Sequence, residues 1–121
     1  MADHSFLESF SPAIDTMVTD NVIDFLTEEC MLQAGNAERI FGKSAIRAVF
    51  DNLYGTIQTI HHQIDDHFSV GDKAVYRGTV TYTRRDGSTL TVPFCDVFRI
   101  KDEKICEYFI YIDWHELSSS L

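Results

Sequence analysis

A single acidic residue interrupts an otherwise apolar strand face of this 121-residue chain. Between residues 89 and 100 alternate positions read Leu90, Val92, Phe94, Asp96, Phe98 and Ile100. An ionised carboxylate among such neighbours would pay several kcal/mol of desolvation, so Asp96 must be neutral, paired with a cation, or facing a wet cavity. In a cavity its pKa would be raised, which suits donation of a proton or a hydrogen bond to a developing oxyanion or a leaving group.

The partner of Asp96 across the sheet depends on the hairpin that precedes its strand. If residues 86–87 form a two-residue loop, Asp96 lies opposite Arg77 and a salt bridge is expected. If residues 86–88 form a three-residue loop, Asp96 lies opposite Gly78, whose missing side chain leaves space for a ligand. We favour the second register, because it groups Asp96 with the apolar face of the preceding strand, which carries Tyr76, Val80 and Tyr82.

Histidine and acidic residues gather in the stretch 61–67. His62 would face inward at the start of a long strand, where a neutral imidazole can act as a general base; the alternative is a hydrogen-bonded histidine at the rim of the core. His61, Asp65 and His67 would share the other face, but they span about 20 Å along a strand, too far for one metal ion. We therefore predict no metal site, and the chemistry we consider needs no cofactor.

Three further residues are candidates for contact with a ligand. Asn36 follows a predicted short strand and could hold a water or a ligand carbonyl, although an asparagine after glycine is equally a turn residue. Tyr76 and Tyr108 would face inward, and each combines a large apolar surface with a hydroxyl that needs a partner when buried. Either tyrosine would line a ligand pocket or pack in the core.

The first third of the chain is predicted to be helical. Pro12 is costly inside a helix, so we expect a break there, with Ser11 capping a second piece that starts at the proline. A further helix is expected to open at Thr19 or Asp20 and to carry an apolar face through Leu26. The apolar face of the first helical region is formed by Phe6, Phe10, Ile14 and Met17. That of the further helix is formed by Val22, Ile23, Phe25 and Leu26.

The rest of the chain changes from helical to strand periodicity. A short strand is expected at residues 30–33 and an amphipathic helix at 42–55, which would end at a left-handed Gly55. Four long strands follow at about 62–70, 73–84, 89–100 and 105–113, with turn residues between them, so an antiparallel meander is predicted. On the first of these strands the inward residues would be His62, Ile64, Asp66, Phe68 and Val70. Helices followed by a curved sheet predict one α+β domain over residues 1–121.

Composition narrows the possible functions. The net charge of −9 opposes the phosphate contacts that nucleic-acid binding requires. The longest apolar run covers only residues 108–112, far less than the roughly 20 residues that cross a membrane. No secretory signal is legible, and the three cysteines suggest reduced thiols, so a cytoplasmic location is expected.

Several spaced elements together resemble the SnoaL-like members of the NTF2-like superfamily. The resemblance implies a cone-shaped α+β barrel in which helices cap a strongly bent antiparallel sheet, leaving a deep apolar pocket, often in a homodimer. It extends over nearly the whole chain and is carried by Gly42-x-x-Ala45-Ile46-Arg47, Gly71-Asp72, Gly78-Thr79-Val80, Pro93, Asp96-Val97-Phe98-Arg99 and residues 105–113.

The resemblance transfers only some catalytic positions. Asp96 is similar to the protonated aspartate that serves ketosteroid isomerase as an oxyanion-hole donor, whereas Phe10 stands where that enzyme has its tyrosine and Ala34 where it has its base. Asn36 resembles the water-holding asparagine of limonene-epoxide hydrolase, but the charged positions of that enzyme are matched here by Gly78, Val80 and Ile110. The acid of polyketide cyclases is not evident at residues 107–110.

The sequence as a whole favours cofactor-independent acid–base chemistry on a small apolar molecule, of the isomerase, dehydratase or hydrolase type. Asp96 would be the acid or oxyanion donor and His62 the base. The predicted ligand contacts are Asn36, Phe10, Tyr76, Tyr108 and Ile110. The alternatives are a non-catalytic binding module with the same pocket, and an interaction domain that uses the outer sheet face. That face carries threonines and aromatic residues and could bury against a second copy in a homodimer.

Overall fold

Short helices come first along the chain and long strands follow, within residues 4–119, which are the residues that this computed structural model describes. The helical elements in that range are η1 (Ser5–Ser9), α1 (Phe10–Asp15), α2 (Thr19–Ile23), α3 (Lys43–Thr56) and α4 (His115–Ser119). The strands are β1 (Leu26–Ala34), β2 (Ile40–Phe41), β3 (Ile57–Val70), β4 (Lys73–Arg84), β5 (Thr89–Lys101) and β6 (Lys104–Ile112).

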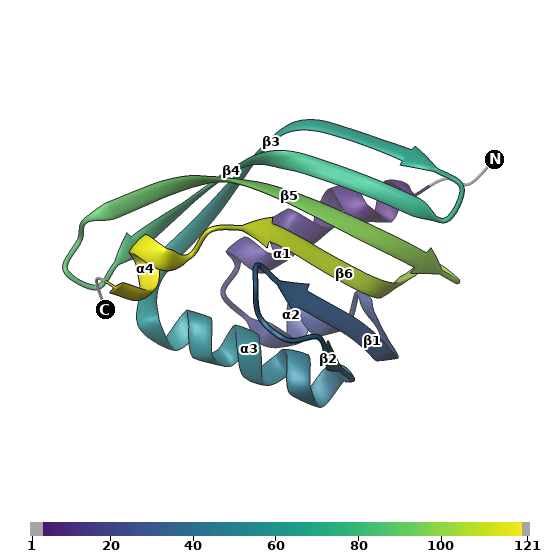
Figure 1. Ribbon diagram of the computed structural model, residues 1–121, viewed down its shortest axis with the longest axis horizontal. Helices are drawn as coiled ribbons and strands as arrows, with labels where there is room; N and C mark the ends of the chain where they lie inside the picture. Colours follow the sequence, from purple (N-terminus) through teal and green to yellow (C-terminus); the bar gives the residue numbers. More distant parts are fainter. Residues whose placement is uncertain (1–3, 120–121) are drawn as a thin grey trace.

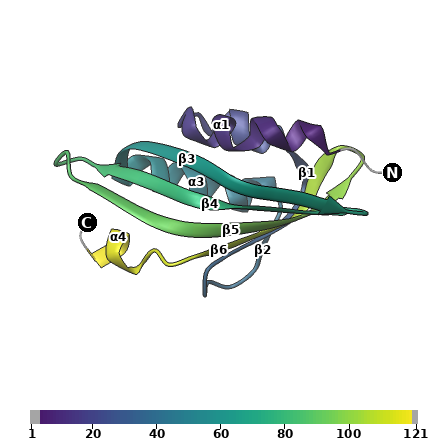
Figure 2. The same ribbon diagram turned by 90° about the horizontal axis from the view of Figure 1, so that it is seen from above.

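The strands form one sheet in the order β2-β1-β6-β5-β4-β3. Figure 1 shows this sheet arching over α3, and Figure 2 shows α1 running alongside β3. The predicted α+β fold, with N-terminal helices on a strongly curved sheet, is confirmed. The sheet is open and does not close into a barrel, and β1 pairs parallel with β6. The four long strands β3–β6 pair antiparallel as predicted, and the short β2 pairs antiparallel with β1.

The helix break predicted at Pro12 lies earlier in the structure. The chain changes from η1 to α1 between Ser9 and Phe10, and Pro12 is the third residue of α1. A proline is tolerated there because the N–H groups of the first helical turn have no partner within the helix. Ser11 is therefore inside the helix and buried, and it does not cap a second piece.

Other boundaries also differ from the predictions. The helix α2 ends at Ile23, because Leu26 already pairs with β6, so the strand expected at 30–33 is longer and begins at Leu26. The helix α3 matches the predicted 42–55, but Gly55 lies inside it and has no positive φ. The chain passes directly from α3 into β3 at Ile57, five residues before the predicted start at 62.

The β4–β5 register differs from both alternatives. Asp96 lies opposite Tyr76, neither opposite Arg77 nor opposite Gly78. The loop is residues 85–87, closed by the Arg84 and Ser88 backbone, because Gly87 supplies the left-handed conformation at its last position. The favoured alternative differs from this register by two residues, which preserves the faces: Tyr76, Val80, Tyr82 and Asp96 are all buried.

A β-bulge at Asp65 changes which residues of β3 face the core, so the prediction for the second half of this strand is wrong. Pairing shifts from Ile64 opposite Gly78 to Asp66 opposite Arg77, so the extra residue reverses the faces of the strand beyond it. Asp66 consequently forms an ion pair with Arg77 away from the core. The two apolar residues that were expected to face inward, Phe68 and Val70, are 59% and 75% exposed.

Gly78 does not leave space for a ligand, as we had expected. A Cβ built on Gly78 would lie 1.8 Å from the backbone oxygen of Gln63. Because Gly78 has no side chain, the backbone of β3 can approach β4 closely just before the bulge. The main core lies between the inner face of the sheet and the helices, and Phe10 is central to it, with edge contacts to the rings of Phe25, Phe98 and Tyr108.

Candidate active site

A small cavity lies between the concave face of the sheet and the helices. Its volume is about 30 Å³, enough for one or two water molecules. Aliphatic and aromatic side chains from α1, α3 and β3–β6 form most of its wall. The polar groups of the wall belong to His62, Tyr82, Asp96, Tyr108 and Trp114.

Asp96 brings a carboxyl group to this cavity without a partner. The side chain is 2% exposed, and its Oδ1 is buried with no hydrogen-bond partner among the described residues. Its strand neighbours are Tyr76 on β4 and Ile110 on β6, so no cation stands beside it across the sheet. Burial raises the pKa of the Asp96 carboxyl well above its usual value, which favours the neutral acid.

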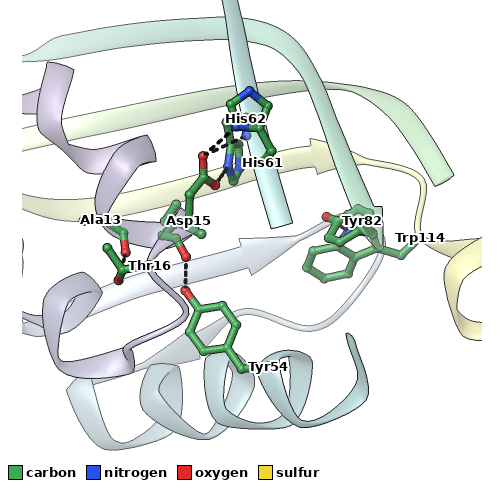
Figure 3. A network of polar contacts seen from close by, with 9 residues as sticks. Ala13, Asp15, Thr16, Tyr54, His61, His62, Tyr82 and Trp114 are labelled. Atoms are coloured by element: carbon green, nitrogen blue, oxygen red, sulfur yellow. Dashed lines mark hydrogen bonds and ion pairs between the residues drawn. The ribbon is translucent and has the colours of Figure 1, made fainter. Parts of the chain in front are cut away.

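His62 is held by Asp15, the last residue of α1 (Figure 3). The ring Nδ1 lies 2.5 Å from Asp15 Oδ1, and the backbone N–H of His62 donates to Asp15 Oδ2 at 2.9 Å. A carboxylate partner favours a proton on Nδ1, which leaves Nε2 as the basic nitrogen of the neutral ring. The His62 ring also lines the cavity, so a histidine whose orientation is held by a carboxylate stands at the cavity wall.

A second pair of residues joins β4 to the segment after β6. Trp114 Nε1 donates a hydrogen bond to the Tyr82 hydroxyl at 2.6 Å (Figure 3). Burial raises the pKa of the Tyr82 phenol, so the hydroxyl keeps its proton and can donate it as a hydrogen bond. Burial also raises the pKa of Tyr108 well above its usual value. Each of these tyrosines is thus a neutral donor at the cavity wall.

A third contact fixes the helices that cover the cavity. The Tyr54 hydroxyl on α3 donates to the backbone oxygen of Ile14 on α1 at 2.7 Å (Figure 3). Burial raises the pKa of Tyr54, so this donor is present throughout the physiological range. The bond ties α3 to α1, the helix that carries Asp15.

The structure brings four of the predicted site residues to the cavity and leaves three away from it. Asp96, His62, Tyr108 and Ile110 line it. Phe10 packs in the aromatic core, and Tyr76 stacks on the exposed His67 with ring centroids 5.0 Å apart, because the bulge puts His67 on the same face of the sheet as Tyr76. Asn36 is exposed in the turn after β1, where Gly35 takes a positive φ.

Asp15, Tyr82 and Trp114 were not among the predicted site residues. Alternation predicts Tyr82 on the inward face. Its hydrogen bond to Trp114 is the feature that distinguishes it from a tyrosine packed in the core. Asp15 follows the apolar face of its helix, and its contact with His62 spans 47 residues, so no local pattern predicts it. Trp114 is the one tryptophan of the chain and follows the last strand, which is a usable but weak signal.

The remaining titratable groups do not form a metal site in the described part of the chain. Within residues 4–119 no three histidine, cysteine, aspartate or glutamate side chains are grouped so that they could hold a metal ion. No helix in that range is both long enough and apolar enough to span a membrane.

Comparison with known proteins assigns the fold. A structure of an NTF2-like protein of unknown function from Burkholderia pseudomallei has a TM-score of 0.84 at 16% identity, covering 98% of this chain and 97% of that one. A putative polyketide cyclase from Pseudomonas putida gives 0.80 at 17%, covering 100% and 98%. An LEH-like epoxide hydrolase from M. tuberculosis gives 0.77 at 18%, covering 95% and 85%.

Comparison at the level of sequence gives a narrower assignment than the structural likenesses. No curated protein sequence matches the chain, but a family model does. Residues 7–108 match the SnoaL-like domain, which covers most of the chain and includes the strand that carries Asp96. The resemblance inferred from the residues is thereby confirmed, and this chain belongs to the SnoaL-like domain family.

Proposed function

We propose that this protein catalyses cofactor-independent acid–base chemistry on a small, largely apolar molecule, with His62 as base and Asp96 as acid or oxyanion donor. The observation that supports this proposal is that an unpartnered buried carboxyl and a histidine oriented by Asp15 border the same cavity. Two titratable groups with different environments are the arrangement that acid–base catalysis requires.

The chemistry follows from the protonation states. Nε2 of His62 removes a proton from carbon or from water, and the resulting imidazolium is stabilised by the Asp15 carboxylate. The neutral Asp96 carboxyl, buried among apolar side chains, donates a hydrogen bond to the oxygen on which negative charge develops. Return of the proton to another carbon gives isomerisation, and proton transfer from Asp96 to a leaving oxygen gives dehydration or ring opening.

The size of the cavity limits how a substrate binds. At about 30 Å³ it is far below the several hundred Å³ of a typical ligand pocket. A substrate of more than roughly three non-hydrogen atoms must therefore displace part of the wall. Trp114 is one candidate for displacement, because it belongs to a short segment outside the strands. Its movement would break a single side-chain hydrogen bond among the described residues, the one to Tyr82.

Proton abstraction can be tested without knowing the natural substrate. Small ketones such as acetone and cyclopentanone are incubated with the protein in D₂O, and exchange at the carbon next to the carbonyl is followed by NMR; a parallel set of small epoxides tests ring opening. We expect protein-dependent turnover in one of the two sets. His62→Gln and Asp96→Asn should each lower it by about 10² to 10³-fold.

The neighbouring histidine provides the matched control. His61 is 77% exposed in its side chain and lies 3.7 Å from Asp15, but it does not line the cavity. His61→Gln should therefore keep the wild-type rate. Equal rates in the wild type and the two site variants, or an equal loss in His61→Gln, would contradict the proposed roles.

A second candidate is a binding module that does not catalyse a reaction. The small volume of the cavity favours it, because the present wall leaves little room to orient a substrate against both His62 and Asp96. This function would appear in the same NMR experiment as ketone-dependent shifts of cavity residues without isotope exchange.

We also propose a homodimer formed through the outer face of β5 and β6. Phe109 and Tyr111 stack there with centroids 6.2 Å apart, and Tyr111 is 57% exposed. Burying such a patch against its own copy would satisfy a two-fold interface. Sedimentation should give a dimer for the wild type and a monomer for Tyr111→Lys. Phe41→Lys, which changes a 67% exposed residue on the edge strand β2, should remain dimeric. A monomeric wild type would refute this interface.

A further inference from the structure

The buried carboxyl of Asp96 lacks a positively charged neighbour. The other titratable side chains that face the cavity are His62 on β3, Tyr82 on β4 and Tyr108 on β6. His62 is already bonded to Asp15, and both tyrosines are neutral. No lysine or arginine of the described residues lines the cavity, and α1 and α3 contribute only Ile14, Val49, Phe50 and Leu53.

The rest of the wall suits an organic cation. Aromatic rings from α3, β4, β5, β6 and the segment after β6 border the cavity, namely Phe50, Tyr82, Phe94, Tyr108 and Trp114. The faces of such rings attract ammonium groups, most strongly where water is excluded, and aliphatic neighbours accept the methyl groups of an alkylated amine. The net charge of −9 further favours approach of a cation over an anion.

We infer that the cavity binds a small alkylammonium ion, with Asp96 as its counter-ion and the surrounding rings as its aromatic wall. This inference rests on the cavity site of the proposed function, but it does not depend on catalysis. It adds a ligand class of opposite chemistry to the neutral substrates considered above. A bound amine would occupy the position of the substrate and would therefore inhibit turnover.

The binding reaction must balance in protons. Burial raises the pKa of the Asp96 carboxyl, and below that pKa an ammonium ion can pair with Asp96 only when the carboxyl loses its proton to solvent. Each cation bound therefore releases one proton, and below the pKa of Asp96 the affinity rises about tenfold for each unit of pH. A neutral molecule of the same shape binds without this release.

Cavity size selects the probes. Methylammonium, with two non-hydrogen atoms, fits a volume of about 30 Å³ in the present wall, whereas trimethylammonium requires the wall to move outward. tert-Butanol is the neutral control for trimethylammonium, because its shape is similar and it carries no charge. All three are added as small molecules to the intact chain.

The experiment measures affinity and proton release together. NMR shifts of cavity residues give the dissociation constants between pH 5 and 8, and an indicator dye in weak buffer gives the protons released. We expect both ammonium ions to release protons on binding, approaching one proton per ion at pH values below the pKa of Asp96, and tert-butanol to release none. Asp96→Asn should weaken ammonium binding at least about tenfold and abolish the release.

Two variants separate the possible sources of the proton. His62→Gln should retain the release, because the proton comes from Asp96 and not from the imidazole. Asp66→Asn, which removes an exposed carboxylate of the same sheet, should bind like the wild type. The proton release in the wild type tests the inference even if Asp96→Asn does not fold.

Ammonium binding that is unaffected in Asp96→Asn, lost proton release in His62→Gln, or equal pH dependence for tert-butanol would overturn the inference. So would the absence of any ammonium binding. None of these results bears on the ketone and epoxide assays, which decide the proposed catalysis separately.

Discussion

Replacing Asp96 by leucine is expected to stabilise the protein by about 1–3 kcal/mol below about pH 4, and by more at neutral pH, while removing the proposed chemistry. The wild-type carboxyl is buried among apolar side chains, and one of its oxygens has no hydrogen-bond partner in the described residues. Leucine removes that unsatisfied group, and its extra bulk is accommodated by the adjoining space of about 30 Å³. Denaturation by urea, monitored by circular dichroism, measures the free energy of unfolding.

The same carboxyl predicts how stability changes with pH. Its pKa is raised by burial, so between the unfolded value of about 4 and the higher folded value the native state holds a proton that the unfolded chain has released. Ionisation of Asp96 in the unfolded chain therefore leaves the free energy of unfolding unchanged below about pH 4. In this window it lowers the free energy of unfolding by about 1.4 kcal/mol for each unit of rising pH. The difference between wild type and Asp96→Leu isolates this slope from all other groups.

Asp66→Leu is the control for both measurements, because Asp66 is exposed on the neighbouring part of the sheet and is paired with Arg77. It should give no gain in stability and should leave the pH slope unchanged. A destabilised Asp96→Leu protein, or one whose stability follows the wild-type pH curve, would show that the Asp96 carboxyl is not an uncompensated buried acid.

Gly78→Ala is expected to destabilise the protein by about 3 kcal/mol or more, and a failure to fold would agree with this expectation. The added Cβ would lie 1.8 Å from the backbone oxygen of Gln63, and backbone cannot move aside as a flexible side chain can. The clash lies next to the bulge at Asp65, so it also opposes the β3–β4 register. Chemical denaturation and the dispersion of amide NMR signals provide the measurement.

Gly55→Ala tests whether this cost is specific. Gly55 lies inside α3, has no positive φ, and a Cβ there meets nothing within 4 Å. Alanine should therefore stabilise the helix by about 0.5–1 kcal/mol. If Gly78→Ala unfolds at nearly the same denaturant concentration as the wild type, the close approach of the two strands is not as tight as the structure has it.

The sequence predicted those features that depend on local pattern. The boundaries of β4 and the position of α3 agree closely with the predictions, because alternation and helical periodicity over a dozen residues are strong signals. The burial of Asp96 followed from the same alternation, and the two-residue offset in register did not disturb it, since side chains alternate with a period of two.

The features that were missed depend on tertiary contacts. The bulge at Asp65 adds one residue to β3, and nothing in the alternation before it indicates that the faces reverse beyond it. The parallel pairing of β1 with β6 joins segments about eighty residues apart, so the strand could be recognised from its residues but its neighbour could not. The Asp15–His62 contact has the same character, because it needs α1 to be docked against β3 before the two side chains meet.

Trp114 gives this molecule a built-in optical probe. It is the only indole in the chain, and it lies at the edge of the hollow with its ring nitrogen bonded to a phenol. The emission maximum of an indole depends on the polarity around it. Intrinsic tryptophan fluorescence therefore reports occupancy of the cavity without any label and without background from a second tryptophan.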